Sequence, residues 1–326
     1  MQQHWDIQAE LLERIKENGG WVNCHAHIDR AYTITKENFA LSQQPRSEKW
    51  ALNSELRKNS TIDQIYDRMA KAIERMLEQG VSALGTFIDV DGDVKDKAIK
   101  ASQRIKDAYG KQLTLRFLNQ SSYGLFNEEK NSRQWFEVGA EYVDIIGGLL
   151  KADAGREAEH LDILLSTANR LGKMVHVHVD ELNIPEEHET ELLAKKTIEH
   201  RMEGKVVAIH GISINARPLK ERKALYKLIA KAQLQFIACP VSWLNERRSE
   251  SLAPIHNPIT PVDEMLSYNI PVGIGTDNIA DIWMPLNNAD LWLDLRVLLE
   301  AARIYDLDTL VQIATRNGKK ILGLSA

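Results

Sequence analysis

The chain has 326 residues, of which 44% are apolar and 27% charged, and this is enough apolar material for one large α/β domain or two ordinary ones. Its formal net charge of −5 gives no electrostatic basis for binding nucleic acid or an anionic membrane. The only two cysteines, Cys24 and Cys239, form no Cys-x-x-Cys pair, which indicates a reduced, cytoplasmic protein without a disulfide framework.

The first segment, residues 1–20, is charged and amphipathic, which predicts an N-terminal helix. It lacks the apolar core of a signal peptide. After Gly20, short apolar runs rich in β-forming residues alternate with longer stretches whose apolar positions recur at helical spacing. No stretch approaches the ~20 consecutive apolar residues that a membrane helix needs. The runs cover residues 21–27, 81–90, 112–120, 142–150, 173–179, 205–210, 234–239 and 270–276.

Two segments depart from this alternation. The polar stretch 40–60 follows the first run without a regular apolar pattern. It predicts a long irregular loop, either a lid over an active site or a plain surface loop. Residues 290–326 follow the last run and contain two helical patterns, which we expect to close the structure.

Strands that alternate with helices predict a parallel sheet, and eight such units are the number that closes a (β/α)8 barrel of the TIM type. We therefore predict an α/β fold with a single domain over residues 1–326. It comprises the N-terminal helix 1–20, a barrel core over 21–289 and closing helices over 290–326. An open doubly wound sheet is the alternative, but it requires a glycine-rich phosphate loop after the first strand, and "CHAHIDRAYT" is not one.

Imidazole and carboxylate side chains gather where the predicted strands end, and barrel enzymes carry their catalytic residues on this rim. His25 and His27 end the first strand and share one of its faces, because side chains alternate along a strand. His178 ends the fifth strand, His210 the sixth, and Asp277 the eighth. These side chains are good ligands for zinc or ferrous iron.

The remaining histidines and a nearby glutamate need separate interpretations. His176 shares the face of His178 but lies one layer deeper, so we interpret it as a packed or supporting histidine rather than a ligand. Glu181 follows His178 by three residues, and a free carboxylate beside a bound metal is a natural proton shuttle, although many loop glutamates are merely solvated. The histidines in helical or loop patterns, which we interpret as surface residues, are His4, His160, His188, His200 and His256.

This pattern resembles the amidohydrolase superfamily, in particular the branch of cytosine deaminase and its relatives. The resemblance runs from about residue 20 to the C-terminus. The full set of motifs, in this order and on these strands, is far more specific than any one of them. The matching motifs are "HAHID" (25–29), "TFIDV" (86–90), "HVDE" (178–181), "AIHG" (208–211) and "GTDNIADIWMPL" (275–286).

The resemblance implies a metal-dependent aminohydrolase, a deaminase that attacks an amino-substituted N-heterocycle with a metal-bound hydroxide and releases ammonia or an amine. The metal lowers the pKa of a bound water toward ~7. By the same resemblance Glu181 is the catalytic acid/base that protonates the ring nitrogen, and His210 hydrogen-bonds the hydroxide and stabilises the tetrahedral centre. Asp277 would also accept the proton of the water. The implied ligands of one divalent ion, Zn²⁺ or Fe²⁺, are His25, His27, His178 and Asp277.

Three features depart from the family pattern. The chain leaves no room for the small β-sandwich that many relatives build from both chain ends, so we expect the barrel alone. Asn278 stands where cytosine deaminases have a second aspartate. Since asparagine can donate as well as accept, a purine-like ring or an s-triazine becomes comparable with a cytosine-like pyrimidine as substrate. In "FLNQSS" (117–122) either Asn119 or Gln120 stands in the place of a substrate-reading glutamine, and Trp283 is either a ring-stacking residue or a buried anchor.

Two other functions remain as alternatives. A two-metal hydrolase of cyclic amides would use a carboxylated lysine after the fourth strand, where Lys151 stands. A barrel that binds a metabolite without catalysis is the second, but it would be expected to lack a catalytic residue, and none of the six is missing. The expected partner is a small heterocyclic substrate, with no nucleic acid and no membrane, and a homo-oligomer stays open.

Overall fold

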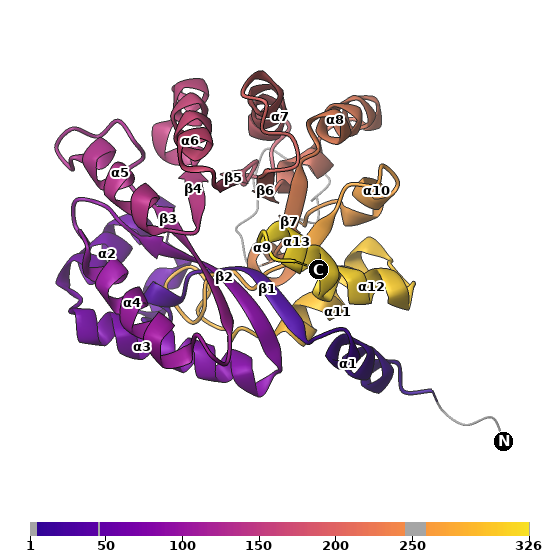
Figure 1. Ribbon diagram of the computed structural model, residues 1–326, viewed down its shortest axis with the longest axis horizontal. Helices are drawn as coiled ribbons and strands as arrows, with labels where there is room; N and C mark the ends of the chain where they lie inside the picture. The colour runs from indigo at the N-terminus through magenta and orange to yellow at the C-terminus, as the bar shows by residue number, and fades with distance from the viewer. Residues whose placement is uncertain (1–4, 45, 245–258, 326) are drawn as a thin grey trace.

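Eight parallel β-strands form one sheet whose order follows the sequence from β1 to β8 (Figure 1). This computed structural model describes residues 5–44, 46–244 and 259–325. A parallel bridge between Ala26 and Asp277 joins the end of β8 to the end of β1, so the sheet returns on itself as a (β/α)8 barrel. The predicted fold class is confirmed. The strands are β1 (Trp21–Ala26), β2 (Val81–Asp89), β3 (Thr114–Gln120), β4 (Ile145–Leu149), β5 (Met174–Val179), β6 (Val206–His210), β7 (Gln235–Ala238) and β8 (Val272–Ile274).

Each predicted run contains one of these strands, although the runs overshoot the strand ends. The difference is largest, and equally so, at β4 and β8, where the runs 142–150 and 270–276 contain strands that cover only Ile145–Leu149 and Val272–Ile274. Apolar residues that flank a strand pack in the turns as well, so a run of them does not mark where the ladder stops. Cys24 in β1 and Cys239 after β7 are buried and free.

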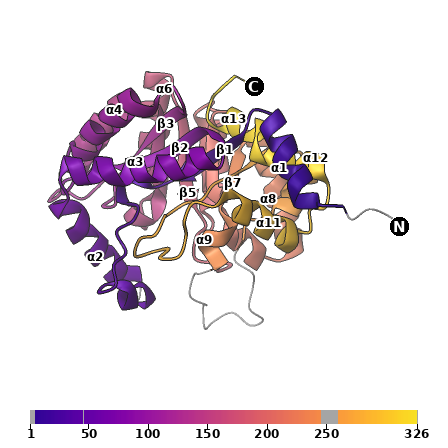
Figure 2. The same cartoon turned by 90° about the horizontal axis from the view of Figure 1, so that it is seen from below.

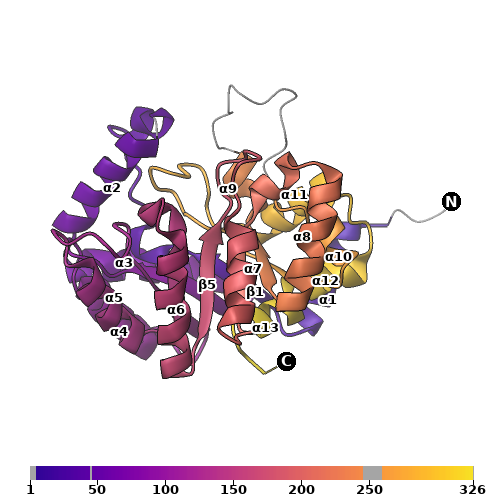
Figure 3. The same cartoon turned by 90° about the horizontal axis from the view of Figure 1, so that it is seen from above.

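Helices surround the sheet, and none of those that the structure describes is long and apolar enough to cross a membrane. Figures 2 and 3 show α2 and α9 at the end of the barrel toward which the strands point, and α13 at the opposite end. The α-helices are α1 (Ile7–Glu17), α2 (Arg46–Asn59), α3 (Ile62–Glu78), α4 (Lys97–Tyr109), α5 (Ser132–Tyr142), α6 (Glu157–Leu171), α7 (Glu189–Glu199), α8 (Leu219–Ala232), α9 (Pro240–Leu244), α10 (Val262–Leu266), α11 (Leu291–Ala302), α12 (Leu307–Ala314) and α13 (Arg316–Ile321). Short 3-10 helices are η1 (Ile28–Arg30), η2 (Phe39–Gln43), η3 (Leu150–Asp153) and η4 (Ile212–Ala216).

Helix α3 shows how the sequence specifies these elements. The Thr61 hydroxyl accepts a hydrogen bond from the Gln64 N–H (3.2 Å), and the Gln64 side chain accepts one from the Thr61 N–H (2.9 Å). This capping box satisfies two backbone donors at the start of the helix. Each large apolar side chain buried on the inner face of the helix contributes about 1.5–3 kcal/mol. That face consists of Ile65, Met69, Ala72, Ile73 and Met76.

The stretch 40–60 is largely helical, so the prediction of an irregular loop is wrong. Helix α2 spans Arg46–Asn59, and two of its buried side chains are polar, namely Asn53 (6% exposed) and Arg57 (5% exposed). Nη1 of Arg57 donates to Oδ2 of Asp91 at 2.8 Å. Because this helix buries an amide and a guanidinium, it has no apolar period that the sequence could reveal.

The segment that follows the barrel contains three helices rather than two. Helix α11 ends at Arg303, whose φ of +54° lies in the left-handed region. Helices α12 and α13 are separated at Thr315, where φ is −132° and ψ is −87°. Each break occurs at a single residue that is neither glycine nor proline. The apolar pattern therefore gave no sign of a helix end, and two of the three helices were predicted as one.

One surface prediction for the histidines is wrong. His160 is 2% exposed, and its Nδ1 lies 2.5 Å from Oδ2 of Asp153, so burial on α6 is compensated by a carboxylate partner. His188 is exposed as predicted, and His200 is partly buried. His4 and His256 lie outside the described residues.

Candidate metal and substrate site

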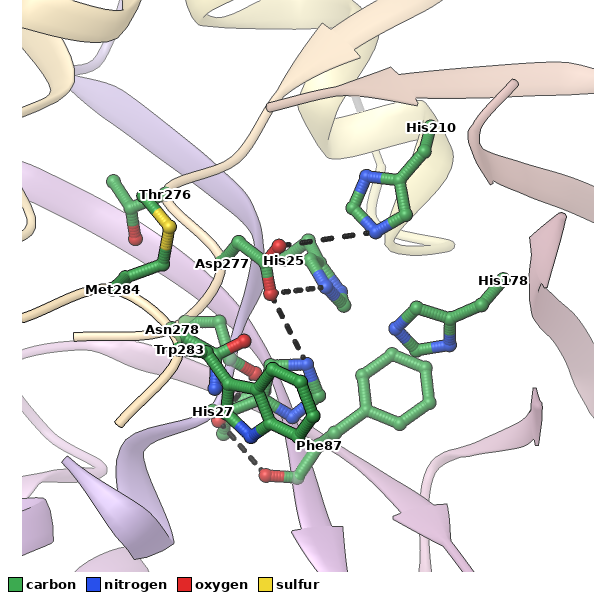
Figure 4. A network of polar contacts seen from close by, with 12 residues as sticks. His25, His27, Phe87, His178, His210, Thr276, Asp277, Asn278, Trp283 and Met284 are labelled. Atoms are coloured by element: carbon green, nitrogen blue, oxygen red, sulfur yellow. Dashed lines mark hydrogen bonds and ion pairs between the residues drawn. The ribbon is translucent and has the colours of Figure 1, made fainter. Parts of the chain in front are cut away.

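Four imidazoles and one carboxylate converge on one rim of the barrel (Figure 4). Nε2 of His25 and Nε2 of His27 each lie 3.3 Å from Oδ1 of Asp277. The ring centroids of His178 and His210 lie 4.9 and 5.5 Å from that of His25. The structure therefore brings together the five residues that the sequence places at the ends of β1, β5, β6 and β8.

Several strand-end residues adopt backbone conformations that are uncommon outside glycine. The angle φ is +74° at His210, +60° at Asp277 and +54° at Asp180, the residue before Glu181. Such left-handed conformations are sterically unfavourable and concentrate at functional sites, where the surrounding structure holds them. His210 ends β6, Asp180 directly follows β5, and Asp277 lies shortly after the end of β8.

The buried imidazoles have the chemistry of metal ligands. Both ring nitrogens of His25 and Nδ1 of His27 have no hydrogen-bond partner among the described residues. Nδ1 of His178 lies 3.0 Å from the backbone oxygen of Gly148 and donates to it, which leaves the lone pair of Nε2 directed at the cluster. Burial lowers the pKa of His27 to about 3 and that of His178 well below its ordinary value. Burial opposes ionisation of Asp277, but the imidazoles of His25 and His27, each 3.3 Å from its Oδ1, hold its pKa well below the ordinary value. An ionised carboxylate therefore stands beside the neutral imidazoles of His27 and His178.

Trp243 fixes the tautomer of His210. The indole Nε1 of Trp243 lies 2.8 Å from Nδ1 of His210. Because an indole N–H only donates, Nδ1 accepts, and the proton of the neutral ring resides on Nε2. One ring nitrogen of His210 lies within 4.8 Å of ligand atoms of His25 and His178, yet a protonated nitrogen cannot bind a metal. His210 therefore faces the cluster as a hydrogen-bond donor.

The sequence analysis did not single out Trp243. It follows β7 in the stretch "CPVSWLN", so the strand-end argument that selected the histidines could have found it. Its side chain is 6% exposed and lines the same cavity as His210.

Glu181 lies directly beside His210, since Oε1 of Glu181 is 3.6 Å from Nε2 of His210. Two reciprocal hydrogen bonds join the ends of the loop that contains it. The Asp180 N–H donates to Oε2 of Glu189 (2.7 Å), and the Glu189 N–H donates to Oδ1 of Asp180 (2.8 Å). Burial raises the pKa of Glu189 to about 8. The loop that presents Glu181 is thus held by the carboxyl groups of the buried Asp180 and the partly buried Glu189.

A cavity of about 500 Å³ opens onto this cluster, within the range of about 300–1,000 Å³ that small-molecule sites occupy. His27, His178, Glu181, His210 and Asp277 line its inner part. One wall comes from α2, which places the stretch 40–60 over the site, as the lid interpretation requires; its closing movement stays a prediction. The lining residues of α2 are Trp50, Ala51, Asn53, Ser54 and Arg57.

Of the two amide candidates on β3, Gln120 is the one that faces the cavity. It is 5% exposed, and its Oε1 has no hydrogen-bond partner among the described residues. Oδ1 of Asn119 instead accepts a hydrogen bond from the Gly147 N–H (3.1 Å) in the neighbouring strand. Asn119 thus bonds within the barrel wall, and of the two amides only Gln120 lines the cavity.

Asn278 and Trp283 also line the cavity, as the sequence analysis expected. Both residues donate a hydrogen bond to Asp281, which is fully buried and does not line the cavity. Nδ2 of Asn278 donates to Oδ2 of Asp281 at 2.5 Å, and the Trp283 N–H donates to Oδ1 of Asp281 at 2.9 Å. Trp283 is thus held through its backbone while its ring forms part of the cavity wall.

Two buried arginines in the cavity wall were missed by sequence reasoning. Nη1 of Arg30 lies 3.4 Å from Oδ1 of Asp89, and Nη1 of Arg57 lies 3.2 Å from Oδ2 of the same carboxylate. Burial opposes ionisation of Asp89, but Arg57 and Arg30 hold its pKa below the ordinary value. No pattern in the sequence distinguishes these arginines from solvated ones, because their burial depends on carboxylates from another strand.

Lys151 does not join the histidine cluster. Its Nζ lies 2.9 Å from Oε1 of Glu187, and it lines a second, more open cavity of about 760 Å³. Leu149, which ends β4, lines the first cavity instead. His176 also points away from the cluster, because its Nε2 lies 3.0 Å from the backbone oxygen of Ile321 in α13.

The pattern of the Amidohydrolase family matches residues 20–326. The chain belongs to this family. It is an enzyme that hydrolyses C–N bonds, and among amidohydrolases it resembles cytosine deaminase and related deaminases. An uncharacterized protein of Haemophilus influenzae is 46% identical over 264 residues, which cover 80% of this amidohydrolase and 95% of that protein. The N-isopropylammelide isopropyl amidohydrolase of Pseudomonas sp. is 25% identical over 338 residues, which cover 98% of this chain and 79% of that protein.

Solved structures share the barrel of this amidohydrolase. The 5-methylcytosine deaminase from Klebsiella pneumoniae, liganded with phosphonocytosine, matches with a TM-score of 0.86 and 23% identity over 93% of this chain and 75% of that chain. The atrazine chlorohydrolase from Arthrobacter aurescens, complexed with zinc, matches with a TM-score of 0.61 and 17% identity over 94% and 71%. At these identities the likeness establishes the fold alone.

Proposed function

We propose that this amidohydrolase is a deaminase that removes an amino or alkylamino group from an N-heterocycle and releases ammonia or an amine. One observation carries the proposal, namely that Oε1 of Glu181 lies 3.6 Å from Nε2 of His210 at the inner end of the cavity, beside the histidine cluster. A carboxylate and an N–H donor are thereby available to the same reacting centre. The relatives named for N-isopropylammelide and 5-methylcytosine support a cytosine-like pyrimidine, a purine-like ring or an s-triazine as substrate.

The residues present fit one divalent ion, Zn²⁺ or Fe²⁺. The donors are three imidazoles, those of His25, His27 and His178, and the carboxylate of Asp277. That donor set suits either metal. When bound, the ion supplies an activated water at neutral pH.

The chain itself supplies the proton transfers. Oδ1 of Asp277 faces His25 and His27, while Oδ2 lies 3.8 Å from Nε2 of His210, so the second oxygen is placed to accept a proton from the attacking water. Protonated Glu181 delivers its proton to the ring nitrogen next to the reacting carbon and regains one from the hydroxyl added to that carbon as the C–N bond breaks. The proton that Asp277 has taken from the water passes to the leaving amine, because an amine leaves poorly without it. The Nε2–H of His210 donates to the oxygen on which negative charge develops.

The cavity wall orients the ring. The amide of Gln120 and the side chain of Asn278 read its hydrogen-bonding edge, and Trp283 packs against it. Exclusion of water from this largely buried pocket strengthens each of these hydrogen bonds.

The rival two-metal mechanism lacks support at its key residue, since Nζ of Lys151 pairs with Glu187 in another cavity. A barrel without catalysis would have no use for Glu181 beside the donor His210. The cytoplasmic location, the single-domain organisation and a homo-oligomeric state stay predictions.

The experiment is a screen of purified, metal-reconstituted protein for release of ammonia and of alkylamines. Substrates are aminated pyrimidines, purines, pterins and N-alkylated s-triazines, and metal per chain is measured on the same sample. We expect release from one ring class with about one metal per chain, and a loss of activity of about 10²–10⁴-fold in Glu181→Gln. Glu186→Gln, in an exposed position of the same loop, is the matched control. Two metals per chain with no release of either product would contradict the proposal.

A further inference from the structure

The buried carboxylate of Asp281 contacts three parts of the cavity wall without lining the cavity itself. Its Oδ1 accepts hydrogen bonds from the backbone N–H groups of Trp283 (2.9 Å) and Met284 (3.0 Å). Its Oδ2 accepts one from Nδ2 of Asn278 (2.5 Å) and lies 3.9 Å from Nε of Arg30. All of these groups are donors, so the carboxylate acts only as an acceptor.

This arrangement fixes the amide of Asn278. An acceptor-only partner requires the NH₂ end of the amide to point toward Asp281, since the carbonyl end would meet oxygen with oxygen. Oδ1 of Asn278 is then at the other end of the amide plane. It accepts no hydrogen bond from any described residue, and the Asn278 side chain lines the cavity.

We propose that Asp281 is a positioning residue that makes Asn278 present its carbonyl oxygen to the substrate. The inference rests on the proposed function and names a requirement on its substrate class. The ring must offer a hydrogen-bond donor, a ring N–H or an amino group, to position 278. The asparagine therefore preserves the acceptor character of an aspartate without adding a second negative charge beside Asp277.

Because Asn278 is buried, the end of its amide that faces the cavity strongly affects which substrates can bind. Asn278 is 7% exposed, and a buried donor or acceptor left without a partner costs about 1–3 kcal/mol. A site built around a hydrogen bond to the substrate rejects analogues that lack the matching group more strongly than an apolar pocket does. The orientation of a single amide thus decides which ring edge the cavity accepts.

The test reverses this hydrogen bond and then restores it. In Asp281→Asn, Oδ1 still accepts from the N–H groups of residues 283 and 284, so Nδ2 faces Asn278 and two NH₂ groups would oppose each other. The Asn278 amide must turn and offer NH₂ to the cavity. In the double variant Asn278→Asp with Asp281→Asn, the new amide donates to the new carboxylate, and an acceptor oxygen again faces the substrate.

We expect Asp281→Asn to raise KM about tenfold or more for the ring identified in the screen, with a much smaller change in kcat and with metal content retained. The double variant should return KM to within about threefold of the parent, because a hydrogen bond and one negative charge are restored. Loss of activity in the double variant beyond that of Asp281→Asn would overturn the proposal, since it would mean that the substrate is read by the N–H. An unchanged KM in Asp281→Asn would overturn it as well.

A second readout needs no substrate. The side-chain NH₂ signals of Asn278 in a ¹⁵N spectrum are assigned by their absence in Asn278→Leu. We expect one of these protons to be shifted downfield and protected from exchange in the parent and to lose both properties in Asp281→Asn. Signals that Asp281→Asn leaves unchanged would refute the positioning role. If the screen instead finds no substrate while these signals respond as expected, the proposed function fails and the positioning by Asp281 stands.

Discussion

Nε1 of Trp243 donates a hydrogen bond to Nδ1 of His210 at 2.8 Å, and this contact decides which nitrogen of the imidazole carries the proton. Trp243→Phe removes the donor but keeps an aromatic ring beside His210. Since Nδ1 then competes with Nε2 for the proton, we expect kcat to fall by about 10–100-fold with little change in KM. The ¹⁵N shifts of the His210 ring should change from one tautomer to a mixture.

Trp135→Phe is the matched control for this experiment, because Trp135 lies in α5 and does not line the cavity. It should leave kcat and the His210 shifts unchanged. A full kcat in Trp243→Phe, together with a single tautomer, would show that the indole does not determine the state of His210.

Two histidines of β5 provide a test of the ligand assignment. His178→Ala should lose nearly all bound metal, because a ligand with a directed Nε2 lone pair is removed. His176→Asn should keep the metal but lower the free energy of unfolding by about 1–3 kcal/mol, since the bond to the Ile321 carbonyl is lost in a buried location. Metal per chain and thermal unfolding measure both. Metal loss in His176→Asn alone would transfer the ligand role to that residue.

Substitution of Gln120 should affect substrate binding, whereas substitution of its neighbour Asn119 in β3 should affect stability. Gln120→Leu is expected to raise KM about tenfold while thermal stability hardly changes, because its Oε1 has no protein partner among the described residues. Asn119→Leu should leave KM nearly unchanged and lower stability by about 1–3 kcal/mol, because the buried Gly147 N–H loses its acceptor. Steady-state kinetics and denaturant unfolding on both variants decide the matter, and equal KM values for the two would contradict the assignment.

Glu189 makes stability depend on pH. Burial raises its pKa from 4.5 to about 8, so between these values the unfolded chain has released a proton that the folded chain retains. The contribution of Glu189 to stability is therefore complete below about pH 4.5, falls as the pH rises, and levels off above about pH 8. Glu189→Gln removes this titration while its side-chain oxygen still accepts from the Asp180 N–H.

The measurement for Glu189 is the difference in unfolding free energy between the variant and the parent at several pH values from 5 to 8.5. We expect this difference to shift in favour of the variant as the pH rises. Glu186→Gln, at an exposed position, should show no such trend. Parallel pH curves for the parent and Glu189→Gln would disprove the raised pKa.

The sequence was sufficient for the barrel and for the cluster because both follow from local periodicity. Alternation within a strand places His25 and His27 on one face, and the barrel rim then collects the ends of β5, β6 and β8. Strand direction also predicts that only one of Asn119 and Gln120 can face the cavity. The choice between them required the register of β3, which the structure supplies.

Other features depend on contacts between distant segments and had no local signal. Helix α2 was missed because its buried face is polar, carrying Asn53 and Arg57, and Arg57 is paired with Asp91 of another segment. His160 was assigned to the surface because a helical pattern does not reveal a partner such as Asp153 in the preceding 3-10 helix. The polarity of Asn278 likewise depends on the donors that already occupy Asp281.

The contact between the ends of β1 and β8, which closes the barrel, also brings together residues of the candidate metal site. The N–H groups of Thr276 and Asp277 donate to the His25 oxygen at 3.0 and 2.9 Å, so residues from the two ends of the barrel sequence meet there. These ligands are far apart in the sequence, so bringing them together carries the entropic cost of closing a long stretch of chain. An ion held there would stabilise the closed barrel by mass action, because it would bind the folded chain and not the unfolded one. Amide hydrogens along this contact should therefore exchange more slowly in the loaded protein than in the metal-free one, while those on the opposite side of the barrel serve as the reference.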